Sequence, residues 1–523
     1  MEIQIDRSGQ VLRLEVPVAK GSSEEEVELV PDLSELAGNG HMVSAAVLAA
    51  KAKAFDDGLM AAVELAADRG AGRLRGKNEL LAGWLERSMA KNDAASHLWV
   101  SLRLRGLQPS VPPEVEQIGL PAMTEFLGAR ERSHPLAFYC WNPELVGIFR
   151  RDRFLQTPLE SGRAQALLDS LGPGREVYEA HLRLAARLTN PLVQEPAALG
   201  RPGANWAVFP PSRALETDLA RRLLGREPIP EGFGLIDELM RRVEQGQLSL
   251  VPGPEDGWYA HQQWCLEPLL KPDQALESPR VERGEGYQAC LRELCRAVLA
   301  MTRETHVKQL ELPSLGCAAR RERPQVRPSL SLEPLVTYYQ RRAESYAFAR
   351  QVLGEAFGRQ ALSALMARQT RQGPVEMPLG PELDFMEALF RGCASQSAFE
   401  VGLPWPVADR RVAQSWLKNL AGDPDVGQDV RCLVPLYFDQ QRRCLKVLAV
   451  LGYAFRPLDV SYVRPPAVPE GVEVEFARDR EPLFYPVAIE VHCRRLLDRD
   501  EFRSLCDRHP PTVSALRAAL ESL

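Results

Sequence analysis

The chain is organised around residues 256–313, DGWYAHQQWCLEPLLKPDQALESPRVERGEGYQACLRELCRAVLAMTRETHVKQLELP, which lie at its middle. This central stretch holds three of the ten cysteines and two of the eight histidines of the chain, together with two tryptophans. Asp256 could cap a short helix through Leu266, and the apolar spacing predicts a longer helix from about Gly286 to Lys308. We expect the central stretch to contribute to the core and any functional site to lie close to it.

The composition is that of a globular protein. With 523 residues the chain is long enough for several domains, and 45% apolar and 26% charged residues are ordinary values. No apolar run approaches the roughly 20 residues that span a bilayer, so no membrane association is expected. Residues 1–19 alternate between apolar and polar and lack the features of a signal peptide, which predicts a cytoplasmic protein. The net charge of −6 argues against a nucleic-acid partner.

The period of the apolar residues changes along the chain. Residues 1–19 alternate as in a β-hairpin, residues 42 to about 421 follow helical spacing, and residues 430–494 alternate again as five consecutive strands. We predict an α+β fold with a large, mainly helical body, a small N-terminal β-hairpin and a C-terminal antiparallel sheet covered by two helices. The expected parts are the hairpin with an acidic segment (1–41), a helical domain (42–310), a helical segment (332–421), and the sheet with its covering helices (430–523).

Several local predictions concern the first helical part. Helices over 42–68 and 74–89 are expected to pair antiparallel about the turn at residues 70–72. The run GAGRLRGKN is not a phosphate-binding loop, because its spacing differs from G-x-x-x-x-G-K-[ST] and no buried strand precedes it. Residues 109–121 are typical of a proline-rich connection, and 134–141 of a short strand or buried extended segment. Asn142 is predicted to cap a helix that has Pro143 at its first position.

His261, Glu304 and His306 are the candidate catalytic residues of the central stretch. Glu304 and His306 are two residues apart, so on a helix they point about 200° away from each other and cannot share a metal. Glu304 instead pairs naturally with Lys308 at the i, i+4 spacing. If the helix ends before Arg303, Glu304 and His306 could form a site with His261 as a third group.

Glu490 and His492 are the candidate metal ligands. They alternate with apolar residues on a predicted strand, so both project from the same face. Two ligands fall short of a complete site, and the polar face of an antiparallel sheet explains the same pattern. No cofactor is predicted, although a divalent metal could bind. The carboxylates at 423, 425 and 429 are spaced as in some calcium loops but lack the glycine and the further acid, which favours a capped turn.

Two further residues admit a functional and a structural interpretation. Asp152 could act as an acid or base, but its three neighbouring arginines favour a partly buried ion pair that fixes its helix. Cys140 could be a reactive thiol, although its apolar neighbours favour an ordinary buried cysteine. The ten cysteines have no regular short spacing, and we expect them to be reduced and mostly buried.

No stretch of the sequence matches a catalytic or binding motif. The missing motifs and the acidic N-terminal segment favour a protein-binding or scaffold role for a soluble cytoplasmic protein, with another protein as its partner. The alternative is a hydrolase-type enzyme whose carboxylate and histidine site, with or without a metal, is assembled around residues 256–313.

Overall fold

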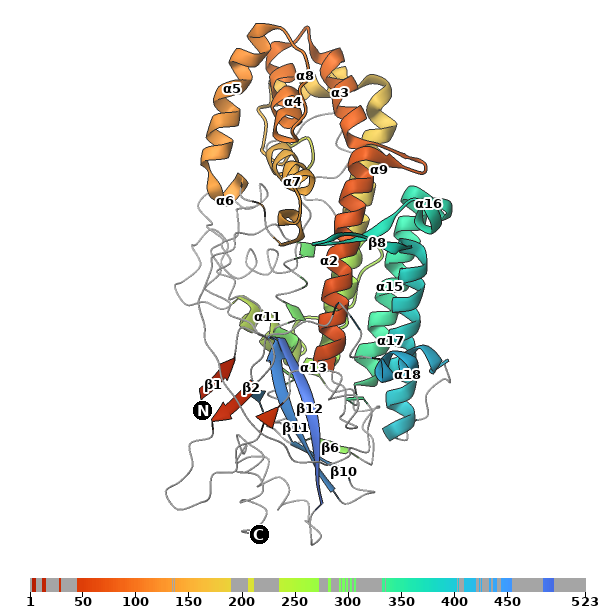
Figure 1. The fold of residues 1–523 in the computed structure, drawn as a ribbon. Coiled ribbons are helices and arrows are strands. Elements are labelled where there is room, and N and C mark those ends of the chain that lie inside the picture. The colour runs from red at the N-terminus through yellow and green to blue at the C-terminus, as the bar shows by residue number, and fades with distance from the viewer. Residues whose placement is uncertain are drawn as a thin grey trace.

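The fold is α+β with a mainly helical body, as predicted (Figure 1). None of the described helices is both long and apolar enough to cross a membrane. The computed structural model describes residues 2–5, 12–15, 28–29, 45–133, 135, 137–189, 206–210, 235–271, 281–283, 291–292, 294–296, 298–299, 302, 305–306, 332–333, 335–401, 403, 409–419, 423, 425, 432–433, 436–439, 444–453 and 483–492.

The helical body is built mostly of α-helices joined by short turns. Its α-helices are α2 (Ala45–Arg69), α3 (Lys77–Ser88), α4 (Asn92–Leu104), α5 (Pro113–Gly128), α6 (Arg130–Ser133), α7 (Pro143–Leu155), α8 (Ser161–Ser170), α9 (Arg175–Leu188), α11 (Leu235–Glu244), α12 (Trp258–Trp264), α13 (Glu267–Leu270), α15 (Val336–Phe357), α16 (Arg359–Ala364), α17 (Leu379–Val401) and α18 (Arg411–Lys418). Two 3-10 turns, η1 (Ala137–Cys140) and η2 (Gly172–Gly174), interrupt the series.

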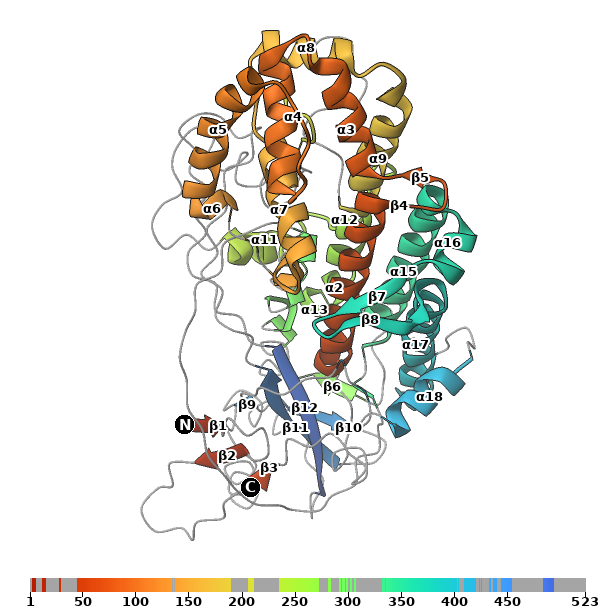
Figure 2. The ribbon, with the colours of Figure 1, turned by 45° about the horizontal axis from the view of Figure 1, so that its top comes forward.

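The long helix α2 runs through the centre of the body (Figures 1 and 2). Its many alanines favour the helix and let neighbouring helices approach closely. It ends at a small hairpin of β4 (Gly70–Ala71) and β5 (Leu74–Arg75), in which Gly70 and Gly72 have positive φ. The hairpin returns the chain to the end of α2, so in both views α3 continues away from α2. The predicted antiparallel pairing of these two helices is therefore wrong.

Two small antiparallel sheets lie at the chain ends. β1 (Glu2–Ile5) and β2 (Leu12–Glu15) form the predicted N-terminal hairpin, and β3 (Glu28–Leu29) pairs with β2. The second sheet has the order β12-β11-β10-β6, with β9 also on β11, from β9 (Cys432–Leu433), β10 (Leu436–Asp439), β11 (Cys444–Tyr453) and β12 (Leu483–His492). Its edge strand β6 (Val281–Arg283) comes from the central stretch and was not predicted. The strands expected at 458–463 and 472–477 and the helices expected at 212–224, 500–507 and 512–520 lie outside the described residues.

Two local predictions are wrong, and one hairpin was not predicted. Residues 109–121 are not only a connection, because Pro113 begins α5, where a proline needs no helical N–H partner, and Pro121 lies inside that helix. Residues 137–140 form the turn η1 in place of a strand. An unpredicted hairpin, β7 (Ala367–Thr370) and β8 (Gly373–Pro378), separates α16 from α17. The helix start at Asn142 is confirmed, because its Oδ1 accepts the N–H of Leu145 at 2.9 Å.

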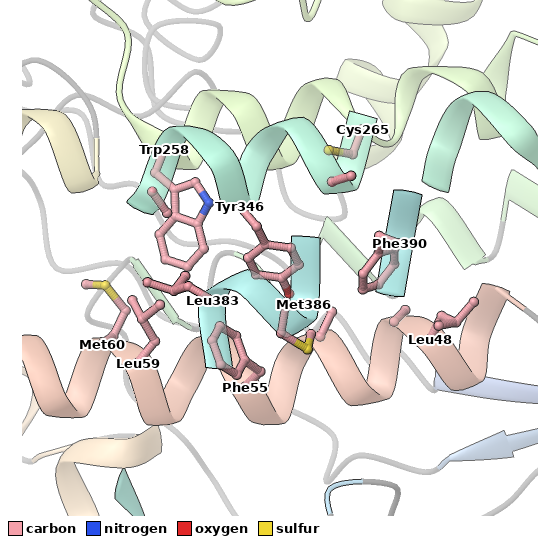
Figure 3. Close-up of a cluster of buried hydrophobic side chains, with 14 of the residues drawn as sticks. Leu48, Phe55, Leu59, Met60, Trp258, Cys265, Tyr346, Leu383, Met386 and Phe390 are labelled. Atoms are coloured by element: carbon pink, nitrogen blue, oxygen red, sulfur yellow. The ribbon is translucent and has the colours of Figure 1, made fainter. Parts of the chain in front are cut away.

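Two apolar cores fill the helical body. The main core takes side chains from α2, α12, α13, α15 and α17, and so from both predicted helical parts, 42–310 and 332–421. Figure 3 shows Phe55, Trp258 and Tyr346 from three of these helices packed together, with ring centroids of Phe55 and Tyr346 5.5 Å apart. The second core lies among α3, α4, α5 and α8, which occupy the top of Figure 1.

Two helices take part in both cores. In α7, Ile148 and Phe149 belong to the main core, whereas Phe154 belongs to the second core. In α9, Tyr178 belongs to the second core and Leu188 to the main core. Between Phe149 and Phe154 of α7 the buried side chains are those of Arg151 and Asp152, so charged groups lie between the two cores on this helix.

Candidate functional site

The central helix α12 is held in place by the end of α9. The N–H of Tyr259 donates to the carbonyl oxygen of Thr189 at 3.1 Å, so the last turn of α9 caps the first turn of α12. A β-carbon at Gly257 would lie 2.6 Å from the carbonyl oxygen of Ala186, and this close approach requires glycine. Gly257 is the N-cap of α12, and Asp256 instead accepts the N–H of Gly253 at 2.7 Å. The predicted cap at Asp256 is wrong.

Asp56 of α2 is the centre of a buried polar network around α12. Its Oδ2 accepts from Gln262 Nε2 at 2.7 Å and from the guanidinium of Arg342, and its Oδ1 accepts from the hydroxyl of Tyr346 at 2.9 Å. Burial raises the pKa of Asp56, and the neighbouring Arg342 lowers it only part of the way back. The network joins α2, α12 and α15, which come from distant parts of the sequence.

His306 extends this network through Gln262. Gln262 gives its amide N–H to Asp56, so its Oε1 must accept, and His306 Nε2, 2.6 Å away, carries the proton. Burial, then Lys53 and Arg342, lower the pKa of His306 to about 3, so the ring is neutral near pH 7. Its Nδ1 is buried without a hydrogen-bond partner among the described residues.

His261 lies on a different side of α12. Its ring stacks on Phe348 with 4.1 Å between ring centroids, and the guanidinium of Arg187 lies 4.8 Å from the same Phe348 ring. His306 instead packs against Trp258, with ring centroids 5.4 Å apart. Burial and Arg187 lower the pKa of His261. The structure therefore does not bring the two histidines together.

The other candidate residues have less described structure around them. Glu304 lies outside the described residues, whereas the adjacent Thr305 donates to Asp57 Oδ1 at 2.7 Å. Glu490 and His492 lie on β12, opposite Lys446 and Cys444 of β11 in the strand register. Within the described part of the chain, no three histidine, cysteine or carboxylate residues are grouped as metal ligands. Metal binding at Glu490 and His492 stays a prediction.

A second polar network forms the layer between the two cores. Asp152 pairs with Lys77 Nζ and with Arg151 Nε, both at 2.8 Å, which confirms the predicted buried ion pair. Asp68 accepts from Arg151 and, at 2.7 Å, from Arg105 Nη2. Burial alone would raise the pKa of Asp68, but Arg151 and Arg105 hold it below its usual range. We call this set, Asp68, Lys77, Arg105, Arg151 and Asp152, the ionic layer.

The acidic loop near residue 423 also has a structural role. Asp425 N–H donates to Asp423 Oδ1 at 2.9 Å, so the predicted capped turn is confirmed. The carboxylate of Asp423 lies 3.0 Å from Lys51 Nζ, and that of Asp425 lies 2.9 Å from Arg368 Nη1. These carboxylates are neutralised by cations of α2 and β7, which disfavours a calcium site.

Cys140 is exposed at the end of η1, in contrast to the expected burial. Its neighbour Tyr139 is buried, and the Sγ of Cys140 donates to the carbonyl oxygen of Pro135 at 3.0 Å. Cys265, Cys295 and Cys393 are buried thiols, as predicted. Burial raises the pKa of Cys265 to about 12, which leaves it almost wholly protonated and unreactive near pH 7.

A Cys140→Ser variant should therefore lose one fast-reacting thiol equivalent in native protein. Stopped-flow titration with an aromatic disulfide measures this count, and titration in denaturant gives the total as a control. We expect Cys265→Ser to leave the fast count unchanged because its sulfur is buried. Equal fast counts for wild type and Cys140→Ser would contradict the exposed position of Cys140.

Helix α5 carries three exposed apolar side chains. Ile118, Leu120 and Leu127 are 38%, 45% and 42% exposed. Another side of α5 is fixed on α4, because Gly119 lies against Trp99 so closely that a β-carbon would come within 2.7 Å of the indole ring. Figures 1 and 2 both show α5 at the outer edge of the upper half. Leu120 and Leu127 lie two turns apart on one flank of α5, whereas Ile118, about 200° from Leu120 around the helix axis, lies on the other flank.

No family model, no curated protein and no solved structure matches the chain. Its function is therefore inferred from the residues themselves. Two kinds of feature are available for this: buried polar networks that hold helices together, and apolar side chains that are left exposed on α5.

Proposed function

We propose that the chain is a protein-binding scaffold that presents the outward side of α5 to another protein. The observation that carries the proposal is the exposure of Leu120 and Leu127, which lie two turns apart on one side of α5. Grouped apolar side chains on a protein surface mark interaction sites more often than scattered ones do. The close contact of Gly119 with α4 supports this role, since a fixed helix loses little conformational freedom on binding.

The polar groups of the central stretch give less support to the hydrolase alternative. Gln262, Arg342 and Tyr346 all donate to Asp56, and His306 gives its Nε2 proton to Gln262. These contacts connect α12 to α2 and α15, as structural networks in cores do. His261 is engaged in stacking on Phe348.

Photo-crosslinking tests the proposal. A photoreactive residue at Gln117, at the middle of the outward side of α5, should form adducts with another polypeptide in cells that express the full chain. The Leu120→Ser/Leu127→Ser background should reduce these adducts, because it removes the apolar contacts. The same photoreactive residue at Leu365, which is 68% exposed at the C-cap of α16, is the matched control. Adducts that form equally at both positions, or no adducts at Gln117, would contradict a binding role for α5.

A further inference from the structure

Two arginines reach the same corner of the chain, just beyond the end of α7. Arg132 of α6 donates from Nη2 to the hydroxyl of Thr157 at 2.6 Å. Arg153 of α7 donates from Nη1 to Oε1 of the adjacent Gln156 at 2.8 Å. Helix α6 lies against α7 at the lower end of α5 (Figures 1 and 2). Two consecutive residues therefore receive two guanidinium groups, both of them only partly exposed.

Neither of these guanidinium groups has an acidic partner. Their acceptors are a neutral hydroxyl and a neutral amide, and neither arginine forms an ion pair with a described residue. Asp152, which precedes Arg153, pairs within the ionic layer instead. Burial, and then the charge of Arg132, lower the pKa of Arg153 to about 10, which still leaves Arg153 cationic near pH 7. The corner thus holds two positive charges that no described residue neutralises, an arrangement that folded proteins usually avoid.

The side chains at this corner are held in place by the second core. The guanidinium of Arg132 lies 5.5 Å from the ring centroid of Phe126, and Phe126 packs edge-on against Phe154 with ring centroids 5.5 Å apart. On the other side, Arg150 donates from Nε to the carbonyl oxygen of Ser133 at 3.3 Å, which joins α7 to α6. A ligand at the corner would therefore meet donors that are already positioned, and such donors lose little conformational freedom on binding.

Several donors at the corner remain available. A guanidinium group has five N–H groups, and Arg132 and Arg153 each use one of them in the bonds described above. The Nε of Arg153 is buried without a hydrogen-bond partner among the described residues. The hydroxyl of Thr157 accepts from Arg132, so its own proton can be donated to a ligand. The corner therefore offers N–H and O–H donors and two positive charges to an anion.

We propose that Arg132, Arg153 and Thr157 form a binding site for a phosphate group, which we call the arginine corner. A phosphate group carries a charge of about −1.5 to −2 at pH 7 and has three strong acceptor oxygens, which matches two arginines and a hydroxyl. Arginine forks bind phosphate oxygens in pairs. A carboxylate or a phosphodiester carries a single charge and would leave one arginine without compensation. This site does not depend on the binding role of α5.

Isothermal titration calorimetry of the full-length chain with inorganic phosphate, at constant ionic strength, tests the proposal. We expect one phosphate to bind, and acetate to bind at least about tenfold more weakly because it brings one charge. Arg132→Gln/Arg153→Gln should weaken phosphate binding by about tenfold or more, because it removes both charged donors. The expected order of affinity is therefore phosphate above acetate in wild type, with little phosphate binding in the double variant.

Arg410→Gln is the matched control. The guanidinium of Arg410 also lies over an aromatic ring, 4.1 Å from the centroid of Phe399, and forms no ion pair with a described residue. Its neighbour Arg411 is neutralised by Asp409, so this arginine stands without a second unpaired cation from the described residues beside it in the chain. Arg410→Gln should leave the phosphate affinity unchanged.

A stability measurement covers the case in which the double variant folds less well. Phosphate should raise the urea midpoint of wild type and of Arg410→Gln, because a ligand that binds the folded state stabilises it. The midpoint of Arg132→Gln/Arg153→Gln should not respond to phosphate, whatever its value without the ligand. Circular dichroism follows all three proteins.

Phenyl phosphate distinguishes the source of the phosphate group. Tighter binding of phenyl phosphate than of inorganic phosphate would identify a phosphate ester as the ligand, and weaker binding would identify the free ion. Three outcomes would overturn the proposal: no phosphate binding, equal affinities for phosphate and acetate, or phosphate binding that survives Arg132→Gln/Arg153→Gln. The last outcome would mean that phosphate binds elsewhere on the chain.

Discussion

Arg342→Met is expected to lower the free energy of unfolding by about 3–5 kcal/mol, because it leaves Asp56 buried without its cation. Arg342 is the only described cation that donates to Asp56, and the remaining donors, Gln262 and Tyr346, are neutral. The midpoint of urea unfolding, followed by circular dichroism, measures the change. Arg411→Met on the exposed pair with Asp409 is the control and should leave the midpoint nearly unchanged.

The loss caused by Arg342→Met should grow with pH. An acid whose folded pKa is raised contributes stability below its unfolded pKa of about 3.9 and loses that contribution as pH rises through the folded pKa. Burial already raises the pKa of Asp56, and removal of Arg342 raises it further. The difference in free energy of unfolding between wild type and Arg342→Met should therefore be smaller at about pH 5 than at about pH 8. A difference that stays constant over this range would mean that Asp56 does not change its ionisation with Arg342.

Asp68→Asn is the second large expected effect, again about 3–5 kcal/mol, because it removes the carboxylate shared by two buried guanidinium groups. Arg151 is 0% exposed and Arg105 is largely buried, so neither can turn to water. Asp409→Asn, next to the exposed Arg411, is the matched control and should have little effect.

The pH dependence at Asp68 should have the opposite sign. The folded pKa of Asp68 is lowered, so its contribution is present above the unfolded pKa of about 3.9 and is lost as pH falls through the folded value. The free energies of unfolding of wild type and Asp68→Asn should show their full difference at about pH 7 and should converge below about pH 4. If the two proteins diverge further at acidic pH, the carboxylate of Asp68 is not stabilised by its arginines.

Local sequence patterns predicted those parts of the fold that depend on neighbouring residues. Asn142 and Pro143 predict the start of α7, and the alternation of residues 1–19 predicts the β1–β2 hairpin. Local patterns failed where the same residues are compatible with two different structures. The prolines at 109–121 suggested a connection, but Pro113 occupies a first helical position, where proline is tolerated, and α5 continues past Pro121. β6 is only three residues long, and its partner β10 lies far along the chain.

The site predictions had the same limit. Helical spacing places both His261 and Gln262 about one turn from Trp258, so it could not show which of the two faces α2. Helical spacing also could not show that Asp56 accepts hydrogen bonds from Gln262 and Arg342, because those partners are 206 and 286 residues away. The α5 surface was missed for a simpler reason: residues 113–128 were not recognised as a helix.

The hairpin between α2 and α3 has a consequence for how this body can change during evolution. In α7 and α9 an inserted residue would rotate everything beyond it by about 100°, and one of the two cores would lose its matching side chains. The length of α7 and of α9 is therefore constrained, because side chains of each helix must face both cores. Residues 70–75 leave the end of α2 and return to it, so extra residues at their tip would alter neither helix. The tip itself is docked on the end of α15, because the N–H of Arg73 donates to the carbonyl oxygen of Phe357 at 3.2 Å and a β-carbon at Gly72 would collide with that oxygen. An insertion at the tip would therefore disturb the contact with α15 and leave α2 and α3 in place.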